Sequence, residues 1–529
     1  MTSNGMPAFP APSFLWTLFG GMLAATILLT PLVMRLAWKK GVVDRGGHRK
    51  IHNRPIPLLG GLAIASPFLV LCAVGAGAGY FAVRYWQWLF RFDPRLFQFM
   101  LSLAEMRETL LLLVLGGAGI VALGIGDDAR GIRARYKLLG QVVLATAICG
   151  LGGSLEQIRI PLVGTVELGK TLGFLVSVLW IVGLVNAVNL IDGMDGLATG
   201  VALIGCAALA ILGLLSGNSL AAIVCTALAG GLVGFLFFNF HPAKVFLGDT
   251  GSMFLGFVLG TVTLMGSHRS DVAIIILGPM LALSFPVFET LISMFRRFVQ
   301  GVPVFASDNR HTHHRLMAKG YSQRQAVLIL YMVTFLLAGA AVASQLIPSD
   351  SSWVFVPLGV AIATLVWVIW LADYFEPMLL GRIFRYRGRN RVLNALAGYS
   401  SLALGAHTET SERNEILNLC RQEMRLCYLA AWFESGETLI ASSGAARVPQ
   451  ANPKGFDPTE RLRVKTNRGN AIIVGYQFQD ENPADFDRRA VPAWLARVFE
   501  NADIRPPQGP NVNWAMMPTR GSGQNRLPQ

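Results

Sequence analysis

The stretch TLGFLVSVLWIVGLVNAVNLIDGMDGLATG, residues 171–200, joins an apolar run to a glycine-rich polar turn. Residues 171–190 contain no charged side chain, and about 20 apolar residues suffice for a helix to cross the hydrocarbon core of a bilayer. Two asparagines lie near the end of the run, and two aspartates follow it. Polar and acidic residues at membrane depth are usually functional. The stretch therefore predicts a membrane-spanning helix that ends at a site.

Similar apolar runs recur along the first 372 residues, and the composition agrees with them. Of the 529 residues, 53% are hydrophobic and only 14% are charged, whereas a soluble domain carries about 25% charged residues. The predicted spans are residues 13–36, 58–83, 108–126, 137–153, 171–190, 196–216, 219–238, 251–266, 272–294, 326–347 and 353–372. We expect an all-α polytopic membrane protein with about eleven transmembrane helices.

Basic residues gather in alternate loops between these spans. They follow the first span (Lys39, Lys40, Arg45, Arg49, Lys50, Arg54), the third (Arg130, Arg133, Arg135, Lys137) and the ninth (Arg296, Arg297, Arg310, Arg315, Lys319, Arg324). The positive-inside rule then places these loops and the C-terminal part in the cytoplasm, and the N-terminus outside. Topology thus accounts for most of the net charge of +14, and we expect no nucleic-acid partner.

The chain is predicted to have four segments. These are a transmembrane domain (1–372), a basic juxtamembrane linker (373–399), a small cytoplasmic α+β domain (400–505) and a disordered tail (506–529). In the third segment we expect helices at 412–433 and 490–501 and strands at 437–442, 461–466 and 470–478. Residues 155–170 alternate apolar and polar side chains around Gly164, which predicts a hairpin on the outer face.

Five aspartates form three clusters at the predicted inner face, each beside glycine. The clusters are GIGDDARGIRARYK (124–137) with Asp127 and Asp128, NAVNLIDGMDGLATG (186–200) with Asp192 and Asp195, and FNFHPAKVFLGDTGS (238–252) with Asp249. A single aspartate would be explained by a helix cap or a salt bridge. Five on one face indicate a bundle interior or a wet cavity, and glycine lets the backbone approach a ligand closely.

Two metal chemistries compete for these groups. The segment DNRHTHHRL (308–316) holds three histidines, which would suit zinc, but no cysteine or HExxH helix completes such a site. Carboxylate oxygens favour Mg²⁺ or Mn²⁺, which bind through one or two carboxylates plus substrate phosphates. Nearby basic residues, among them Lys50 in HRKIHNRPIPLLGG (48–61), Lys244 and Arg315, suit a nucleoside diphosphate.

These motifs, in this order, resemble the signatures of the polyprenyl-phosphate N-acetylhexosamine-1-phosphate transferase superfamily, of the glycosyltransferase family 4 type, over residues 13–372. The resemblance implies a helix bundle in the bacterial inner membrane with its active site at the cytoplasmic face. It implies transfer of a sugar 1-phosphate from a UDP-sugar to a polyprenyl phosphate such as undecaprenyl phosphate, with Mg²⁺ or Mn²⁺ and release of UMP. RRFVQGVPVFASDNRHTHHRL (296–316) and RKIHNRPIPLLGG (49–61) resemble the branch that uses UDP-GlcNAc.

The same resemblance implies residue roles. Asp249, with Asp192, is expected to bind the metal, and Asp127 to deprotonate the lipid phosphate. Asp128 is expected to support the metal or a lysine, and Lys50 to neutralise phosphate charge. The expected substrate-binding residues are Asn186, Asn189, Asp192, Asp195, Asn239, Lys244, Phe246, His311, His313, His314 and Arg315.

Several alternatives stay open at this level. The donor could be another UDP-N-acetylhexosamine or UDP-MurNAc-pentapeptide. Acids inside a membrane also occur in ion-coupled transporters, but those place them near the midplane and show internal repeats. A CDP-alcohol phosphotransferase would carry its acids in one motif instead of three. The C-terminal domain could regulate the enzyme, form a homodimer or recruit downstream glycosyltransferases.

Overall fold

The computed structural model describes residues 12–44, 55–85, 94–155, 157–160, 164–265, 277–300, 311–347 and 351–372, and short stretches between 395 and 499. The chain divides into two compact units. The first comprises Met1–Arg296 and Phe305–Pro377, and the second comprises Arg297–Val304 and Met378–Gln529. The first unit holds every predicted site residue that the structure describes.

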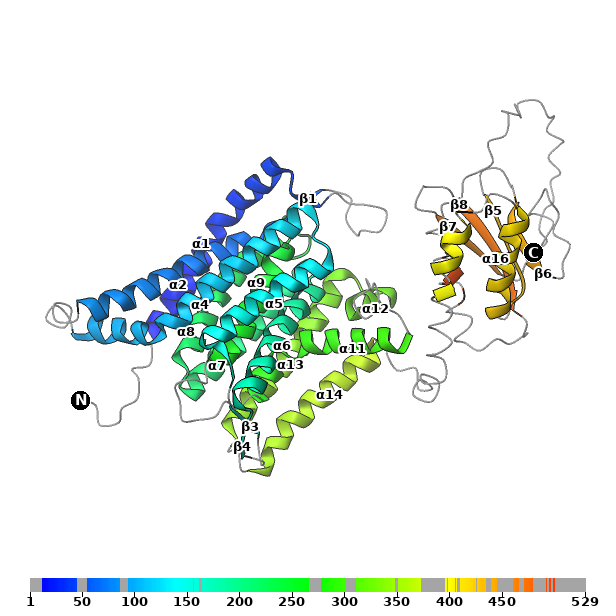
Figure 1. Ribbon diagram of the computed structural model, residues 1–529. Coiled ribbons are helices and arrows are strands. Elements are labelled where there is room, and N and C mark those ends of the chain that lie inside the picture. The colour runs from blue at the N-terminus through cyan, green and yellow to red at the C-terminus, as the bar shows by residue number, and fades with distance from the viewer. Residues whose placement is uncertain are drawn as a thin grey trace, which may run out of the picture. The chain divides into compact units, whose positions relative to one another are not determined.

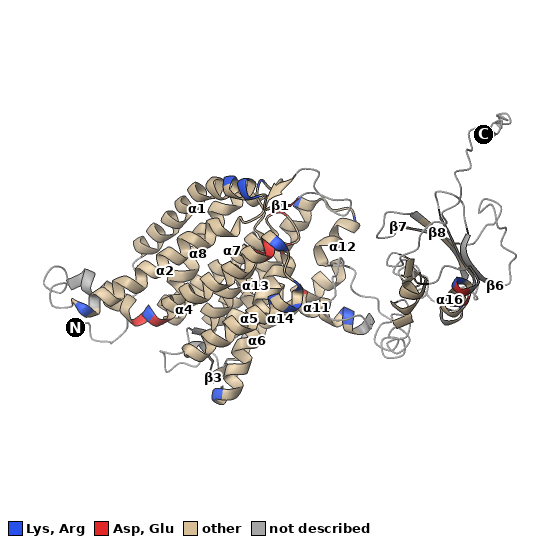
Figure 2. Ribbon diagram, turned by 45° about the horizontal axis from the view of Figure 1, so that its top comes forward, with Lys and Arg blue, Asp and Glu red and all other residues tan. Residues whose placement is uncertain are grey.

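Seven helices of the described residues are long and apolar enough to cross a membrane. They are α1 (Pro12–Lys40), α2 (Gly61–Arg84), α4 (Pro94–Arg130), α6 (Gly169–Ile191), α7 (Leu197–Ser216), α8 (Ser219–Asn239) and α13 (Gln323–Leu346) (Figure 1). A helix suits hydrocarbon because it pairs its own backbone groups. Along the ribbon, the charged residues that the structure describes lie mainly at the ends of the long helices (Figure 2). The chain is therefore a helical membrane protein.

The other four predicted spans coincide with shorter or interrupted helices. These are α5 (Ala134–Ile148), α9 (Gly248–Met265), the pair α10 (Leu277–Ala282) and α11 (Ser284–Gln300), and α14 (Phe355–Leu371). None of these helices exceeds 18 residues. Seven spans are thus supported by helix length and composition, and the number eleven stays a prediction.

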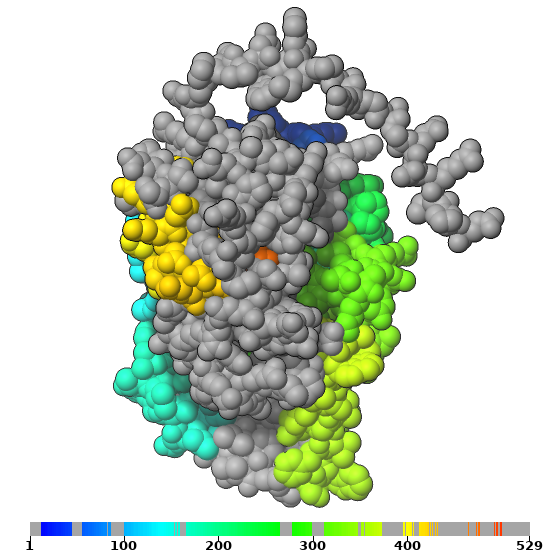
Figure 3. Space-filling model, turned by 90° about the vertical axis from the view of Figure 1, so that its right-hand side faces the viewer, coloured from blue at the N-terminus to red at the C-terminus, as the bar shows by residue number. Residues whose placement is uncertain are grey.

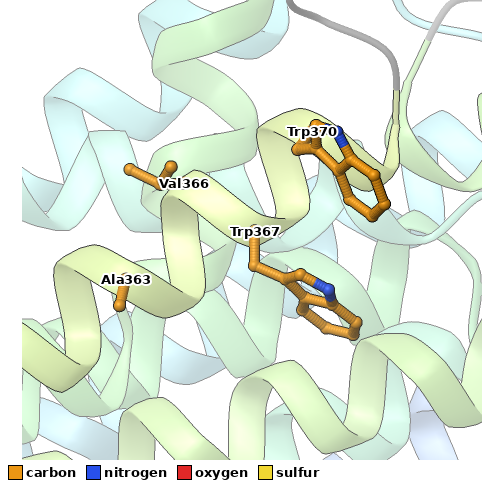
Figure 4. A pocket seen from close by; sticks show the side chains of 4 residues that line it. All are labelled: Ala363, Val366, Trp367 and Trp370. Atoms are coloured by element: carbon orange, nitrogen blue, oxygen red, sulfur yellow. The ribbon is translucent and has the colours of Figure 1, made fainter.

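The surface of α14 is apolar and aromatic. Trp367 and Trp370 are 40% and 66% exposed, and together with Ala363 and Val366 they line a hollow on this helix (Figure 4). Tryptophan is enriched where a membrane protein meets the lipid headgroup level. This face of α14 is suited to contact with lipid.

Helix α9 lies inside the bundle, packed against α2, α4, α6, α7 and α8. Nearly all of its residues are buried. Glycines allow the close packing, because a Cβ atom added at Gly256 would lie 2.5 Å from the carbonyl oxygen of Leu184 in α6, and one added at Gly61 would lie 2.1 Å from Cα of Gly251. Small residues at helix contacts are typical of membrane bundles. The packing brings Asp249, in the first turn of α9, to the ends of α4 and α6.

Two short antiparallel strand pairs lie at the ends of the bundle helices. β3 (Gln157–Ile160) pairs with β4 (Gly164–Glu167), which confirms the predicted hairpin. β1 (Val43–Asp44) pairs with β2 (Ile56–Pro57). The second pair brings the start of α2 back to the end of α1, and residues 45–54 between the strands lie outside the described residues.

The second unit contains a helix and a sheet. Helix α16 (Thr410–Glu423) precedes β5 (Leu426–Phe433), β6 (Leu439–Gly444), β7 (Glu460–Lys465) and β8 (Ala471–Phe478), which form an antiparallel sheet in the order β6-β5-β8-β7. Part of the surface of this unit is seen in yellow in Figure 3. Strands occur at all three predicted positions. The predicted linker and the predicted helix at 490–501 lie largely outside the described residues, and the predicted tail lies outside them entirely.

The predicted helix at 412–433 is wrong beyond Glu423, because residues 426–433 form β5. Leu429 and Ala431 are both fully buried, and residues two apart on one face are the pattern of a strand. The segment also carries three aromatic residues, which are enriched in strands. Burial of alternate side chains on one face of a sheet therefore makes this segment a strand, although the residues before it form a helix.

Candidate active site

Helix α4 ends in the pair Asp127 and Asp128, and a tight turn leads on to α5. Gly131 makes this turn with a φ of +67°, which glycine adopts readily. The Asp127 carboxylate closes the turn, since its Oδ1 accepts a hydrogen bond of 2.6 Å from the Ile132 amide. Its other oxygen accepts a hydrogen bond of 2.7 Å from Lys137 Nζ in the first turn of α5.

Lys137 joins carboxylates from two other helices. Its Nζ donates to both Asp127 and Asp249 and lies 3.3 Å from Asn189 Oδ1. Asn189 in turn donates to Asp249 Oδ1 at 2.6 Å and to Ser252 Oγ at 2.9 Å. The side chains of Lys137, Asp127 and Asp249 are 14%, 10% and 31% exposed, and partial burial strengthens attraction between charges. The network locks the ends of α4 and α6 to the starts of α5 and α9.

Asp128 holds the first turn of α9 in place. Its carboxylate accepts hydrogen bonds from the amides of Asp249 (2.9 Å) and Thr250 (3.0 Å) and from Thr250 Oγ1 (2.6 Å). The first amides of a helix lack partners within the helix and favour a negative charge. Gly248 must precede them, because its φ is +71° and a Cβ atom there would lie 2.7 Å from Asp128 Oδ2. Asp128 therefore fixes the backbone that presents Asp249 to Lys137.

Asp192 follows α6 directly and faces the same region. No described residue donates a hydrogen bond to its carboxylate. Burial, and next the negative charges of Asp249, Asp128 and Asp195, raise the pKa of Asp192 well above its usual range. Among the residues that the structure describes, five carboxylates thus converge once Asp127 is included, and Lys137 is the cation that contacts two of them, Asp127 and Asp249. The region has an excess of negative charge that a further cation would balance.

Asp195 and Asn239 hold the turn formed by residues 240–246. Asp195 Oδ2 lies 2.8 Å from His241 Nδ1. Asn239 is 3% exposed; its Nδ2 donates to the Val245 carbonyl at 2.9 Å, and its Oδ1 accepts from Thr199 at 2.7 Å. Both polar atoms of the Asn239 side chain thus form hydrogen bonds within the protein. The structure therefore gives Asn239 a role in shaping the turn.

Helix α12 (Thr312–Ala318) carries the predicted histidine segment. His313 is 2% exposed, and its ring lies 5.6 Å from that of His311 and 4.3 Å from that of His314. A Cβ atom added at Gly193 would lie 2.8 Å from His313 Nε2, so the histidines meet the turn that follows Asp192. Burial, and next the charge of His314, lower the pKa of His313 to about 3. This ring is therefore a neutral hydrogen-bonding group at physiological pH.

Three further predicted site residues lie beside the Lys137 network or in the turn at 240–246. Asn186 donates to Gln141 Oε1 of α5 at 2.7 Å, one turn away from Asn189. Lys244 is exposed at the turn. The backbone amide of Phe246 donates to the Pro57 carbonyl at 2.9 Å.

Two basic residues complete the comparison with the predictions. Arg315 Nη1 donates to the carbonyl oxygen of Ala372 at 3.2 Å, which ties α12 to the residue that follows α14. Lys50 lies outside the described residues, and its role stays a prediction.

Lys137 is the main residue to which sequence reasoning gave no role in the site. It appears in the stretch GIGDDARGIRARYK as one of several basic residues after α4. The spacing of ten residues from Asp127 spans a turn between two helices, so no helical periodicity relates them. The available signal was its position as the last of these basic residues, at the first residue of the predicted span 137–153.

The donor atoms fit a divalent cation in part. Among the described residues, no three His, Cys, Asp or Glu side chains form a protein-only metal site. Mg²⁺, however, binds through one or two carboxylates and completes its shell with water and substrate phosphates. Asp192 offers unused oxygens, whereas both oxygens of Asp249 already accept hydrogen bonds from Lys137 and Asn189. Of the two aspartates, Asp192 therefore has the oxygens that could bind such an ion together with substrate oxygens.

Comparison with known proteins agrees with this geometry. The family described as glycosyl transferase family 4 matches residues 110–267, which include both acidic residues at the end of α4, the asparagine–aspartate turn after α6 and Asp249. A Bacillus subtilis protein named "Probable undecaprenyl-phosphate N-acetylglucosaminyl 1-phosphate transferase" is 36% identical over 60% of this chain and 82% of its own length.

Two further relatives match this chain over a still larger share of their own lengths. The "Decaprenyl-phosphate N-acetylglucosaminephosphotransferase" of Mycobacterium tuberculosis is 33% identical over 68% of this chain and 91% of its own length. A "Phospho-N-acetylmuramoyl-pentapeptide-transferase" of Pelotomaculum thermopropionicum is 31% identical over 62% of this chain and 97% of its own. The names of these relatives all describe transfer of a phosphorylated sugar, and the sugar named differs among them.

Proposed function

Because the chain belongs to glycosyl transferase family 4, in the superfamily of polyprenyl-phosphate N-acetylhexosamine-1-phosphate transferases, we propose that it transfers N-acetylglucosamine 1-phosphate from UDP-GlcNAc to undecaprenyl phosphate or a similar polyprenyl phosphate. An oxygen of the lipid phosphate forms a bond to the sugar-bearing phosphorus, and the bond from that phosphorus to the oxygen of UMP breaks. The products are polyprenyl-diphosphate-GlcNAc and UMP. This would be the first membrane step of a cell-envelope polysaccharide.

The observation that carries the proposal is the convergence of Asp127, Lys137, Asn189 and Asp249 from four helix ends. The acceptor and the donor are both anions, so they repel each other as they approach. Catalysis of phosphoryl transfer consists mainly of positioning and of neutralising this charge. Lys137 supplies one fixed positive charge. Mg²⁺ or Mn²⁺ held by Asp249 and Asp192 would supply more and would polarise the diphosphate.

The two carboxylates at the end of α4 have different proposed roles. Asp127 is proposed to accept a proton from the lipid phosphate, as the resemblance implies; its carboxylate would have to give up its contact with Lys137 or with the Ile132 amide to do so. Asp128 is occupied by the first turn of α9. We assign it the support of Asp249 and not direct contact with the substrate. Lys50 is proposed to neutralise the donor phosphates, as the resemblance implies.

The donor is proposed to lie between the turn at 240–246 and α12. Asp195 and Asn239 shape that turn, which carries Lys244 for the diphosphate and Phe246 for the uridine. His313 and His314 on α12 meet the Asp192 turn at Gly193 and are proposed to recognise the sugar. A neutral His313 fits an uncharged hexosamine, to which it can donate or accept a hydrogen bond.

The membrane placement follows from the proposed reaction. A long polyprenyl chain stays in the bilayer, so its phosphate must be met at the membrane surface. We propose eleven spans in the bacterial plasma membrane, with the N-terminus outside and the site and the C-terminal unit in the cytoplasm, as the loop charges predict. The C-terminal unit is proposed to support a homodimer or to recruit downstream glycosyltransferases.

The test is a panel of donors. The purified protein in detergent, with undecaprenyl phosphate and Mg²⁺, should release UMP from UDP-GlcNAc faster than from UDP-GalNAc or UDP-MurNAc-pentapeptide. UMP release from a different donor only would replace the sugar and keep the reaction. No release from any donor, together with solute transport in liposomes, would refute the proposal. Asp249→Asn in the same assay should lose turnover while the protein still unfolds in a cooperative thermal transition, since the change removes a charge and not volume.

A further inference from the structure

Glu289 on α11 is a buried carboxylate that the reaction described above does not use. Its side chain is 1% exposed, deeper than any carboxylate in the Lys137 network. Its Oε1 accepts a hydrogen bond of 2.8 Å from the Thr312 amide, and Oε2 accepts one from Thr312 Oγ1. Oε1 also lies 3.3 Å from His311 Nδ1. A charge so deeply buried is retained only when its partners compensate the loss of water.

These contacts fall at the first residue of α12. A helix needs acceptors for its first amides, and usually the residue before the helix supplies one from its side chain. Here that residue is His311, which makes no such hydrogen bond. Glu289 on α11, 23 residues before Thr312 in the chain, supplies the acceptor instead. Helix α12 has seven residues, too few to be stable alone, so this tether decides where it begins.

The start of α12 determines where the histidine rings lie. The ring of His311 stacks on that of His313 with an angle of 19° between the planes, and His313 Nε2 lies against Gly193 of the Asp192 turn. A shift of α12 would move these rings together, away from the region between the turn and the helix.

We propose that Glu289 is a positioning residue that holds the histidine segment (311–314) against the Asp192 turn and thereby sets the affinity and selectivity for the UDP-sugar donor. Glu289 is too deeply buried to contact the substrate itself; it acts through Thr312 and His311. This inference rests on the proposed function for its link to the donor, while the tether itself is independent of it.

The first test compares steady-state kinetics of Glu289→Ala, Glu289→Gln and Thr312→Val with those of the wild type. Loss of a charge-assisted buried hydrogen bond corresponds to about ten- to a hundredfold in an equilibrium. We expect KM for the sugar donor to rise by this factor in Glu289→Ala, with a smaller change in kcat. The ratio of kcat/KM between UDP-GlcNAc and UDP-GalNAc should fall. Thr312→Ser retains the hydroxyl and should restore wild-type values, and Leu291→Ala, on the exposed face of the same helix, serves as the matched control.

The second test does not need turnover. Hydrogen–deuterium exchange of the peptide that covers 311–318 should be about tenfold faster or more in Glu289→Ala, with the rest of the bundle exchanging as in the wild type. Unchanged exchange in this peptide would overturn the tether. Faster exchange throughout the bundle, with donor KM and selectivity unchanged, would show a merely structural role and overturn the proposal. If the wild type releases no UMP from any donor, the proposed function fails, and the exchange result still decides whether Glu289 holds α12.

Discussion

Replacing Lys137 with methionine tests the central network most directly. Methionine has nearly the length of lysine and no charge, so the substitution removes the ammonium and little volume. The ammonium is the only described group that contacts Asp127 and Asp249 together. Without it, two partly buried carboxylates and the incoming phosphates face one another with one fixed positive charge fewer.

The magnitude follows from the two ion contacts. A hydrogen bond to a charged group contributes about 1.5–3 kcal/mol, so two of them contribute about 3–6 kcal/mol. At 1.4 kcal/mol per factor of ten, even the lower value corresponds to about a hundredfold in rate. Both contacts count nearly in full, because the three side chains are at most 31% exposed and solvent screens them little.

The assay is UMP release from the preferred donor at saturating lipid phosphate. Lys137→Met should lower kcat/KM by at least about a hundredfold, and Lys137→Arg should fall between it and the wild type, since a planar guanidinium restores the charge but not the geometry. Lys39→Met, at the exposed end of α1, is the control and should match the wild type. A Lys137→Met protein within tenfold of wild-type turnover, with an unchanged unfolding midpoint, would refute the role of the ammonium.

Three further predictions follow from the same site. Gly193→Ala should raise the donor KM about tenfold or more, because the new methyl would lie 2.8 Å from His313 Nε2; Gly183→Ala on α6, where a Cβ meets open space, should have no effect, and equal KM values in the two variants would contradict the packing. Since the pKa of His313 is lowered to about 3, this ring stays neutral above that pH, and the preference between two UDP-sugars should be constant from about pH 6 to 8. A preference that changes with a midpoint near the usual histidine value would show that His313 titrates. Removal of residues 400–529, which belong to the second unit, should leave turnover measurable; complete loss in a folded truncation would place that unit in the catalytic machinery.

Much of the fold was readable from the order of the residues alone. The apolar runs predicted helices where the structure has them, because a segment in lipid must satisfy its own backbone and therefore forms a helix at the length that the bilayer sets. The alternation around Gly164 predicted the β3–β4 hairpin. The glycine-flanked aspartates at the ends of the runs indicated one polar region, and Asp127, Asn189 and Asp249 do meet there, around Lys137.

The division of roles within that region came only from the tertiary structure. Asp128 caps a helix through the amide of Asp249, 121 residues later, Lys137 reaches an aspartate 112 residues away, and Glu289 caps α12 from another helix. The strand at 426–433 likewise depends on pairing with β6 and β8. Hydrophobic periodicity along the chain shows which residues of a helix or strand will be buried. A hydrogen bond across a bundle depends instead on which helices pack together. The sequence by itself determined the helices and the chemical groups at their ends, and packing decided which group each carboxylate would hold.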